Sequence, residues 1–89
     1  MCGIYLTNIK EDLNVVNQNL KKIKFRGPDN ISVKKYNDII VGHLRLSILD
    51  LAERSNQPFE FLNYIISYNG EIYNFKEIKI TLKSLGCIF

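Results

Sequence analysis

The sequence predicts an α+β fold, a layered sheet structure built from short strands and two amphipathic helices. Three observations indicate this class. Short apolar runs rich in β-forming residues recur, two segments repeat apolar residues at helical spacing, and turn-forming residues separate these segments. The expected order of elements is β-α-β-β-β-α-β, which indicates a layered sheet without its later strands.

The first strand is expected at Cys2–Ile9, an apolar run rich in β-forming residues. Asp12 can then cap a helix, because its carboxylate can accept a hydrogen bond from the first turn. The helix is expected to end before Arg26–Asp29, where glycine followed by proline cannot continue the turn. Its apolar face consists of Leu13, Val16, Leu20 and Ile23.

A hairpin is expected after this helix. Its strands are Ile31–Tyr36 and Ile39–Ser47, and Asn37 and Asp38 form a plausible two-residue turn between them. The following segment, Asp50–Phe59, is polar and contains a proline, so it is predicted to be a loop.

The remainder is expected to add a strand, a helix and the start of another strand. Phe61–Tyr68 is predicted to be one strand that runs into Asn69 and Gly70, a pair typical of tight turns. A second helix should end at Gly86, and Cys87–Phe89 should begin the last strand. The apolar stripe of that helix consists of Phe75, Ile78, Leu82 and Leu85.

Composition indicates one small globular domain, with 46% hydrophobic and 24% charged residues among 89. The net charge of +3 is far below the signature of a nucleic-acid-binding protein. The apolar runs are too short to span a bilayer, and the start lacks the features of a signal peptide. We therefore expect a cytoplasmic protein without nucleic-acid or membrane partners, in which Cys2 and Cys87 stay reduced.

Five motifs occur in a characteristic order along the chain. They are "MCGI" at Met1–Ile4, "RGPD" at Arg26–Asp29, "GHLRLSILDL" at Gly42–Leu51, "NQPF" at Asn56–Phe59 and "YNGEIYNF" at Tyr68–Phe75. In this order and spacing, they closely resemble the N-terminal glutamine amidotransferase domain of glutamine-hydrolysing asparagine synthetases. The resemblance covers essentially the whole chain, and it places the chain among class II amidotransferases, which are N-terminal-nucleophile hydrolases.

The resemblance implies an αββα sandwich of which only the N-terminal half is present, so residues 1–89 are expected to be a partial glutamine amidotransferase type-2 domain. In the family, an "SD-x-E" segment with an aspartate for the α-amino group of glutamine follows the position where this chain stops. The family's second domain uses ATP and Mg to adenylate aspartate and receives the ammonia. No cofactor is therefore expected in this chain. Its expected partners are L-glutamine and a synthetase domain or a separate synthetase chain.

The resemblance gives Cys2 a catalytic meaning. After removal of Met1, Cys2 would carry both a thiol and a free α-amine. A thiol titrates at about 8.5 and an α-amine at about 7.7–8.0, so the amine can accept and return the thiol proton near neutral pH. By resemblance, Cys2 attacks the side-chain amide of glutamine, releases ammonia and leaves a γ-glutamyl thioester for water. Without the other motifs, Cys2 would be interpreted as a small buried residue of a strand.

The resemblance also assigns the remaining site residues. The Asn69 side chain and the Gly70 N–H would stabilise the oxyanion, although an Asn-Gly pair alone indicates only a turn. Arg45 would hold the α-carboxylate of glutamine with its planar fork of donors, and an ion pair with Asp50 or Glu71 is the alternative. Glu71 belongs to the glutamine-binding set. The same pocket would be lined by Leu46, Ser47, Ile48 and Leu49.

Other polar residues are expected to be structural. Arg26 and Asp29 should hold the loop beside Cys2, and His43 should serve the core or a hydrogen bond. The basic run Lys21–Arg26 should be a solvated helix face. No metal site is predicted, because Cys, His and carboxylate residues lack the spacing of metal ligands.

Two other functions stay open at this level. The chain could be a catalytically inactive remnant that binds glutamine or a partner subunit, or a small structural domain in which Cys2 is incidental. Intact Cys2, Arg45, Asn69, Gly70 and Glu71 argue against the latter. With half of the sandwich missing, we expect weak glutaminase activity, or none, and poor solubility from the 89-residue chain.

Overall fold

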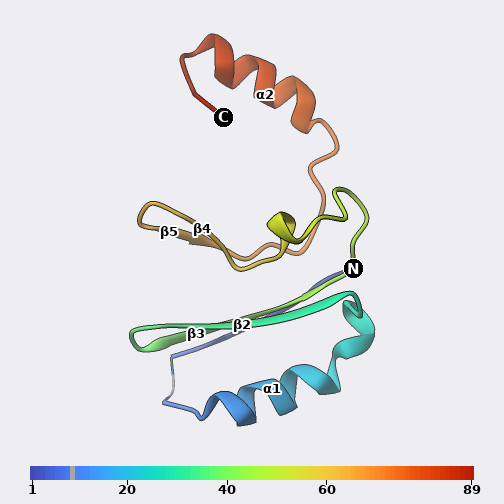
Figure 1. The fold of residues 1–89 in the computed structure, drawn as a ribbon, viewed down its shortest axis with the longest axis vertical. Coiled ribbons are helices and arrows are strands. Elements are labelled where there is room, and N and C mark those ends of the chain that lie inside the picture. Colours follow the sequence, from blue (N-terminus) through green and yellow to red (C-terminus); the bar gives the residue numbers. More distant parts are fainter. Residues whose placement is uncertain (9) are drawn as a thin grey trace.

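The computed structural model describes residues 1–8 and 10–89 (Figure 1). Ile9, the last residue of the first predicted strand, lies outside the described residues. Within the described part, helix α1, a three-stranded sheet, a two-stranded hairpin and helix α2 follow one another in space (Figure 1). The predicted α+β class is confirmed.

The three-stranded sheet is antiparallel and has the order β1-β3-β2. Its strands are β1 (Gly3–Thr7), β2 (Asn30–Tyr36) and β3 (Ile39–Arg45), with β3 in the centre. The predicted hairpin between β2 and β3 is confirmed. Asn37 in its turn has a φ of 48°, a left-handed conformation that asparagine tolerates better than most residues.

Helix α1 (Leu13–Lys22) covers one face of this sheet and confirms the first predicted helix. Asp12 caps it, because its Oδ1 accepts a hydrogen bond from the backbone nitrogen of Asn14 at 2.8 Å. Leu20 packs so closely on the sheet that a Cβ atom on Gly42 would lie 2.7 Å from its Cδ1. The core residues are Val16, Leu20, Ile40 and Leu44. A short 3-10 helix, η1 (Lys24–Arg26), leads out of α1.

The prediction of one strand at Phe61–Tyr68 is wrong. The chain instead forms an antiparallel hairpin of β4 (Phe59–Phe61) and β5 (Tyr64–Ile66). It reverses at Leu62, whose φ is 52°. The predicted loop at Asp50–Phe59 therefore ends one residue early, and it contains a 3-10 helix, η2 (Glu53–Ser55).

Glu60 connects the hairpin to the first sheet. Its Oε1 accepts hydrogen bonds from the Lys34 ammonium at 2.9 Å and from the Tyr36 hydroxyl at 2.6 Å. Burial, followed by this bond to Glu60, raises the pKa of Tyr36 to about 12. The two layers are thus joined through a side chain of β4 and two side chains of β2.

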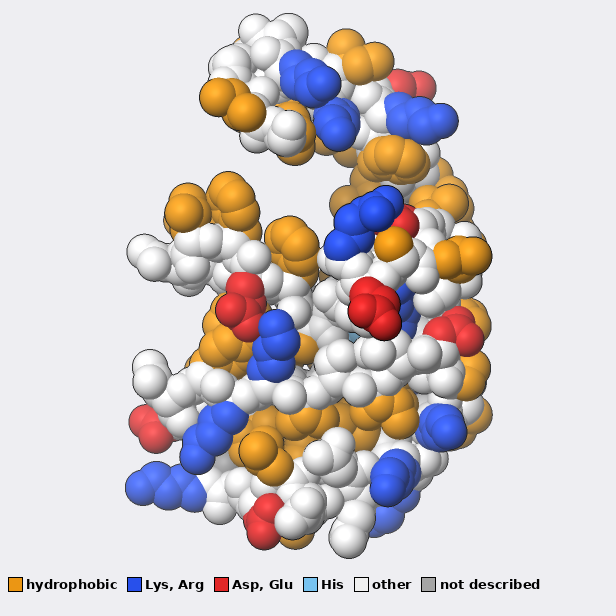
Figure 2. Space-filling model, viewed as in Figure 1, with side chains coloured by type: hydrophobic (Ala, Val, Ile, Leu, Met, Phe, Trp, Pro, Cys, Tyr) orange, Lys and Arg blue, Asp and Glu red, His pale blue; other side chains and the backbone are white. Residues whose placement is uncertain are grey.

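Helix α2 (Phe75–Ser84) confirms the second predicted helix, but the predicted strand at Cys87–Phe89 is wrong. Gly86 has a φ of 90° and ends the helix as expected. The backbone nitrogen of Cys87 donates to the carbonyl of Leu82 at 3.0 Å, so it belongs to the helix cap. Helix α2 stands apart from the hairpin, and apolar side chains line both sides of the gap (Figure 2).

Candidate active site around Cys2

Cys2 directly precedes β1 and lies beside the end of the central strand β3. Gly3 pairs with Leu44, so Cys2 reaches the residues that leave β3. Its Sγ accepts a hydrogen bond from the backbone nitrogen of Leu46 at 3.4 Å and lies 3.8 Å from the Leu46 carbonyl oxygen. The thiol is half-buried and has a fixed neighbour on the sheet.

The "RGPD" segment holds this region together, as predicted. Nε of Arg26 donates to the carbonyl oxygen of Cys2 at 3.2 Å. The backbone nitrogen of Asp29 donates to the carbonyl of Arg45 at 3.0 Å, and its carboxylate accepts from the nitrogen of Ser47 at 2.7 Å. Gly27 presses against β3, because a Cβ atom there would lie 2.4 Å from the Leu44 carbonyl oxygen.

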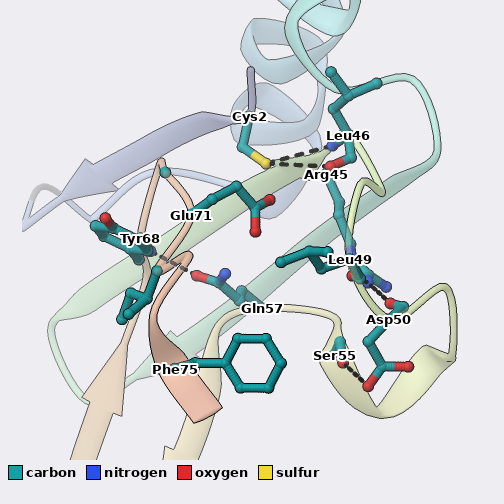
Figure 3. A pocket seen from close by; sticks show the side chains of 12 residues that line it. Cys2, Arg45, Leu46, Leu49, Asp50, Ser55, Gln57, Tyr68, Glu71 and Phe75 are labelled. Atoms are coloured by element: carbon teal, nitrogen blue, oxygen red, sulfur yellow. Dashed lines mark hydrogen bonds between the residues drawn. The ribbon is translucent and has the colours of Figure 1, made fainter. Parts of the chain in front are cut away.

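An open cavity of about 330 Å³ lies beside the thiol (Figure 3). The Glu71 side chain extends into it between Cys2 and Gln57 (Figure 3). The walls of the cavity come from the residue before β1, the end of β3, the 49–57 loop, the segment after β5 and the start of α2. The lining residues are Cys2, Arg45, Leu46, Leu49, Asp50, Ser55, Gln57, Tyr68, Gly70, Glu71, Ile72 and Phe75.

A second cavity of about 100 Å³ also reaches the thiol. Cys2 therefore stands between two hollows, and Gly70 and Glu71 line both. The smaller cavity is lined by Met1, Cys2, Leu46, Ile48, Asn69, Gly70, Glu71 and Tyr73. Of the predicted site residues, Asn69 and Ile48 line only this smaller cavity, whereas Ser47 lines neither.

Arg45 is buried, with only 6% of its surface exposed, and its guanidinium binds the neighbouring loop. Nη1 donates to the Ala52 carbonyl at 2.9 Å and to Oδ1 of Asn56 at 3.0 Å. Nη2 donates to the carbonyl oxygens of Leu49, at 3.4 Å, and Asp50. The two terminal nitrogens carry four N–H groups in total, and these face four neutral oxygen acceptors.

The ion pair considered for Arg45 therefore does not form with Asp50 or Glu71 in the described part of the chain. The Asp50 carboxylate instead accepts hydrogen bonds from the Ser55 hydroxyl at 2.7 Å and the Arg54 guanidinium at 3.1 Å. The bond from Ser55, followed by that from the Ala52 nitrogen, lowers the pKa of Asp50. The loop is folded around its own polar groups.

Comparison with known proteins decides the family. The model of the glutamine amidotransferase domain matches residues 1–89. The chain belongs to this family. The resemblance expected from the five motifs is thereby confirmed.

The relatives of this amidotransferase chain are glutamine-hydrolysing asparagine synthetases. It is 41% identical over 91 residues to the putative asparagine synthetase 2 of Methanocaldococcus jannaschii, which covers 80% of this chain and 17% of that protein. It is 33% identical over 91 residues to asparagine synthetase 2 of Oryza sativa subsp. japonica, and this match covers 94% of this chain and 15% of that protein. Asparagine synthetase 3 of Bacillus subtilis is 32% identical over 98 residues, and this match covers 97% of this chain and 15% of that protein.

The chain thus spans only 15–17% of the length of these relatives. No solved structure matches it significantly.

The candidate site differs from the sequence-based prediction in two features. The tight turn predicted at Asn69 and Gly70 is an open bend, and Gly70 does not have a positive φ. Gly70 instead lies against the Tyr68 ring, because a Cβ atom there would lie 2.6 Å from the hydroxyl of Tyr68. Gln57 and Tyr68 line the larger cavity. The sequence predicts no role for either residue, although both stand in motifs that carry the resemblance.

His43 lies in the core and makes a hydrogen bond, as expected. It is fully buried on β3, and its Nε2 lies 3.3 Å from the Tyr68 carbonyl oxygen. Burial is the main cause that lowers the pKa of His43. The hydrogen bond to Tyr68 raises this pKa in part, and the charge of Arg45 lowers it further. The imidazole is therefore neutral near pH 7.

The described residues contain no group of three or more His, Cys, Asp or Glu side chains arranged to hold a metal ion. In the same part of the chain, neither helix has the length and apolar character needed to cross a membrane.

Proposed function

We propose that Cys2 is the nucleophile that hydrolyses glutamine to glutamate and ammonia. The observation that carries the proposal is the position of its thiol. Cys2 lines the same cavity as Arg45, Gly70 and Glu71, and it lines a second cavity together with Asn69. These residues come from segments far apart in the chain, yet they include every polar group except Ser47 that the family resemblance assigns to glutamine within residues 1–89.

The reaction requires that Met1 be removed, so that the α-amine of Cys2 is free. This amine takes the thiol proton, and the thiolate attacks the side-chain amide carbon of glutamine. The C–N bond then breaks, the amine returns the proton to the leaving nitrogen, and ammonia departs from a γ-glutamyl thioester. Water adds to the thioester and gives its proton to the amine. Cleavage of the C–S bond then releases glutamate and restores the thiol.

The oxyanion of each tetrahedral intermediate would be stabilised by the side-chain amide of Asn69 and the backbone N–H of Gly70. One such donor lowers the barrier by about 3–4 kcal/mol. Their location in the smaller cavity supports this assignment, because it places the developing charge on the side of Cys2 that faces the bend.

Arg45 and Glu71 would hold the amino-acid end of glutamine in the larger cavity, lined by Leu46 and Leu49. The four oxygen atoms around the Arg45 guanidinium mean that a substrate carboxylate would use Nε or replace one of the loop carbonyls. Binding of glutamine would then be coupled to the position of the 49–57 loop.

We further propose that the chain is part of an N-terminal-nucleophile αββα sandwich in an asparagine synthetase-like protein. The order of layers supports this proposal, with α1 outside the first sheet and α2 beyond the hairpin (Figure 1). The ammonia would serve asparagine biosynthesis in a synthetase domain that uses ATP and Mg, in the cytoplasm. The names of the relatives, which are glutamine-hydrolysing asparagine synthetases, support the link to asparagine biosynthesis.

The test is covalent labelling with a diazoketone analogue of L-glutamine, followed by mass spectrometry of the chain. Intact mass first establishes whether Met1 has been removed. We expect one adduct, on Cys2, whose formation free L-glutamine slows. Cys87 is an internal control because its thiol is exposed and lies outside both cavities. Cys2→Ser should abolish labelling, and Cys87→Ser should leave it unchanged.

Retention of Met1, or equal labelling of Cys2 and Cys87, would contradict the catalytic proposal. The second candidate is an inactive remnant that only binds glutamine, in the cavity beside Cys2. It predicts binding of L-glutamine by calorimetry without an adduct on Cys2.

A further inference from the structure

Tyr68 is held at both of its backbone groups by side chains from other segments. Nε2 of His43 lies 3.3 Å from the Tyr68 carbonyl oxygen. The backbone nitrogen of Tyr68 donates to Oε1 of Gln57 at 2.5 Å (Figure 3). Tyr68 directly precedes Asn69, so these bonds fix the two peptide groups that lead into the proposed oxyanion donors.

The bond from His43 has a defined direction. A carbonyl oxygen only accepts hydrogen bonds, so Nε2 must carry the proton, and neutral His43 then has a bare Nδ1. That Nδ1 is buried and has no partner within the described residues. Such a group costs free energy, whereas an apolar side chain would fill the core without this loss. The contact with Tyr68 is therefore the feature that distinguishes His43 from an apolar core residue.

We propose that His43 and Gln57 are positioning residues that set Asn69 and Gly70 relative to Cys2. This inference rests on the function proposed above. Because a peptide group is planar, holding the Tyr68 carbonyl also fixes the direction of the Asn69 N–H. Gln57 fixes the preceding peptide group in the same way. Together they leave little freedom to the chain where it enters the bend.

The ring of Tyr68 extends this effect to Gly70. A Cβ atom on Gly70 would lie 2.6 Å from Oη and 2.7 Å from Cζ of Tyr68. The ring thus lies directly on the glycine, and a displacement of Tyr68 would change the surface at the Gly70 backbone. Neither bond reaches Cys2. Gln57 also lines the larger cavity, but its side-chain oxygen is bonded to Tyr68, so the effect of both residues on Cys2 is indirect.

The experiment compares two probes of Cys2 in the full chain after removal of Met1. The diazoketone analogue of glutamine must lie in the substrate site with its ketone oxygen at the proposed oxyanion donors, whereas alkylation by iodoacetamide needs no such placement. His43→Leu and Gln57→Met each remove one bond to Tyr68. We expect the maximal rate of diazoketone labelling to fall about 10- to 100-fold in each. The half-saturating concentration should change less, and the iodoacetamide rate should stay within about twofold.

His43→Gln is the conservative control, because its amide nitrogen can donate from the place of Nε2, and it should restore diazoketone labelling. Unchanged diazoketone labelling of both disruptive variants would overturn the proposal. An equal loss with both probes would also overturn it, because it would indicate general disruption. If His43→Leu does not fold, Gln57→Met decides, because Gln57 is only half-buried.

Failure of the proposed function has a separate signature, which is absence of diazoketone labelling in the unmodified chain. Nitrogen NMR of His43, the single histidine of the sequence, then tests the two hydrogen bonds to Tyr68 directly. The proposal is supported if the proton of His43 stays on Nε2 and if the Tyr68 amide proton exchanges slowly. Gln57→Met should then accelerate that exchange. A freely exchanging imidazole, or a Tyr68 amide indifferent to Gln57→Met, overturns the proposal.

Discussion

The sulfur atom of Cys2 accepts a hydrogen bond from the backbone nitrogen of Leu46 at 3.4 Å, across a separation of 44 residues. On its other side, the Cys2 carbonyl accepts a bond from Arg26 at 3.2 Å. A residue next to the start of a chain would ordinarily be mobile. Here both its side chain and its backbone are attached to the end of the sheet.

Gly27→Ala should destabilise the chain by about 3 kcal/mol, because the added methyl group would meet the backbone of β3. The nearest atoms, the carbonyl carbon and oxygen of Leu44, lie at 2.4 Å and cannot rotate away. Urea denaturation measures the change. Gly86→Ala is the matched control, because its Cβ meets no atom within 4 Å and it carries only the cost of a φ of 90°. That cost is about 1 kcal/mol. Equal losses for the two variants would show that Gly27 does not press on β3.

Arg45→Met should lower the free energy of unfolding by about 2–4 kcal/mol, because four part-buried hydrogen bonds to the 49–57 loop would lose their donor. Arg45→Lys should be intermediate, since an ammonium keeps three donors but not the planar fork. Urea denaturation of the three proteins gives the order. A stability of Arg45→Met equal to that of the unmodified chain would show that Arg45 does not hold the 49–57 loop.

Local sequence patterns account for the parts of the fold that the sequence predicted well. The cap at Asp12, the turn at Asn37 and the stop at Gly86 are each determined by neighbouring residues. The apolar stripe of α1 identified Val16 and Leu20, which are completely buried. The motifs contain all the residues that line the two cavities except Ser55, although these residues lie far apart in the sequence.

The misassigned features depend on contacts between distant segments. The run "FLNYIISY" has the composition of one strand, but Leu62 reverses it, and Glu60 then reaches Lys34 and Tyr36 of β2. The partners of Arg45 come from the path of a loop, and the contact between His43 and Tyr68 joins residues 25 positions apart. No local pattern encodes these contacts, so the sequence could not predict them.

Leu62→Gly should stabilise the chain by about 0.5–1 kcal/mol, because glycine adopts a φ of 52° without the steric cost that leucine bears. Little packing would be lost, since 83% of the Leu62 surface is exposed. Thermal and urea unfolding measure the gain. Asn63→Gly is the control, because the φ of Asn63 is not positive and glycine there only adds freedom to the unfolded chain. Destabilisation by Leu62→Gly would show that the hairpin does not turn at this residue.

Folding stability should fall as the pH drops below about 6.5, the usual pKa of histidine. Burial lowers the pKa of His43 in the folded chain, so between the two values the unfolded chain binds more protons. Stability therefore rises with pH through this window and is fully present above it. Arg45 is the neighbouring charge that opposes protonation, and Asp50 and Glu60, whose pKa values are lowered, act in a more acidic range.

His43→Gln isolates this effect, because glutamine keeps a donor for the Tyr68 carbonyl but does not titrate. Urea unfolding of both proteins between about pH 5 and about pH 8 should give parallel curves above the window. Below about pH 6.5, only the unmodified chain should lose stability through this group. Identical curves across the whole range would mean that the pKa of His43 is the same in the folded and unfolded chains. The buried, neutral imidazole inferred from its contact with Tyr68 would then be wrong.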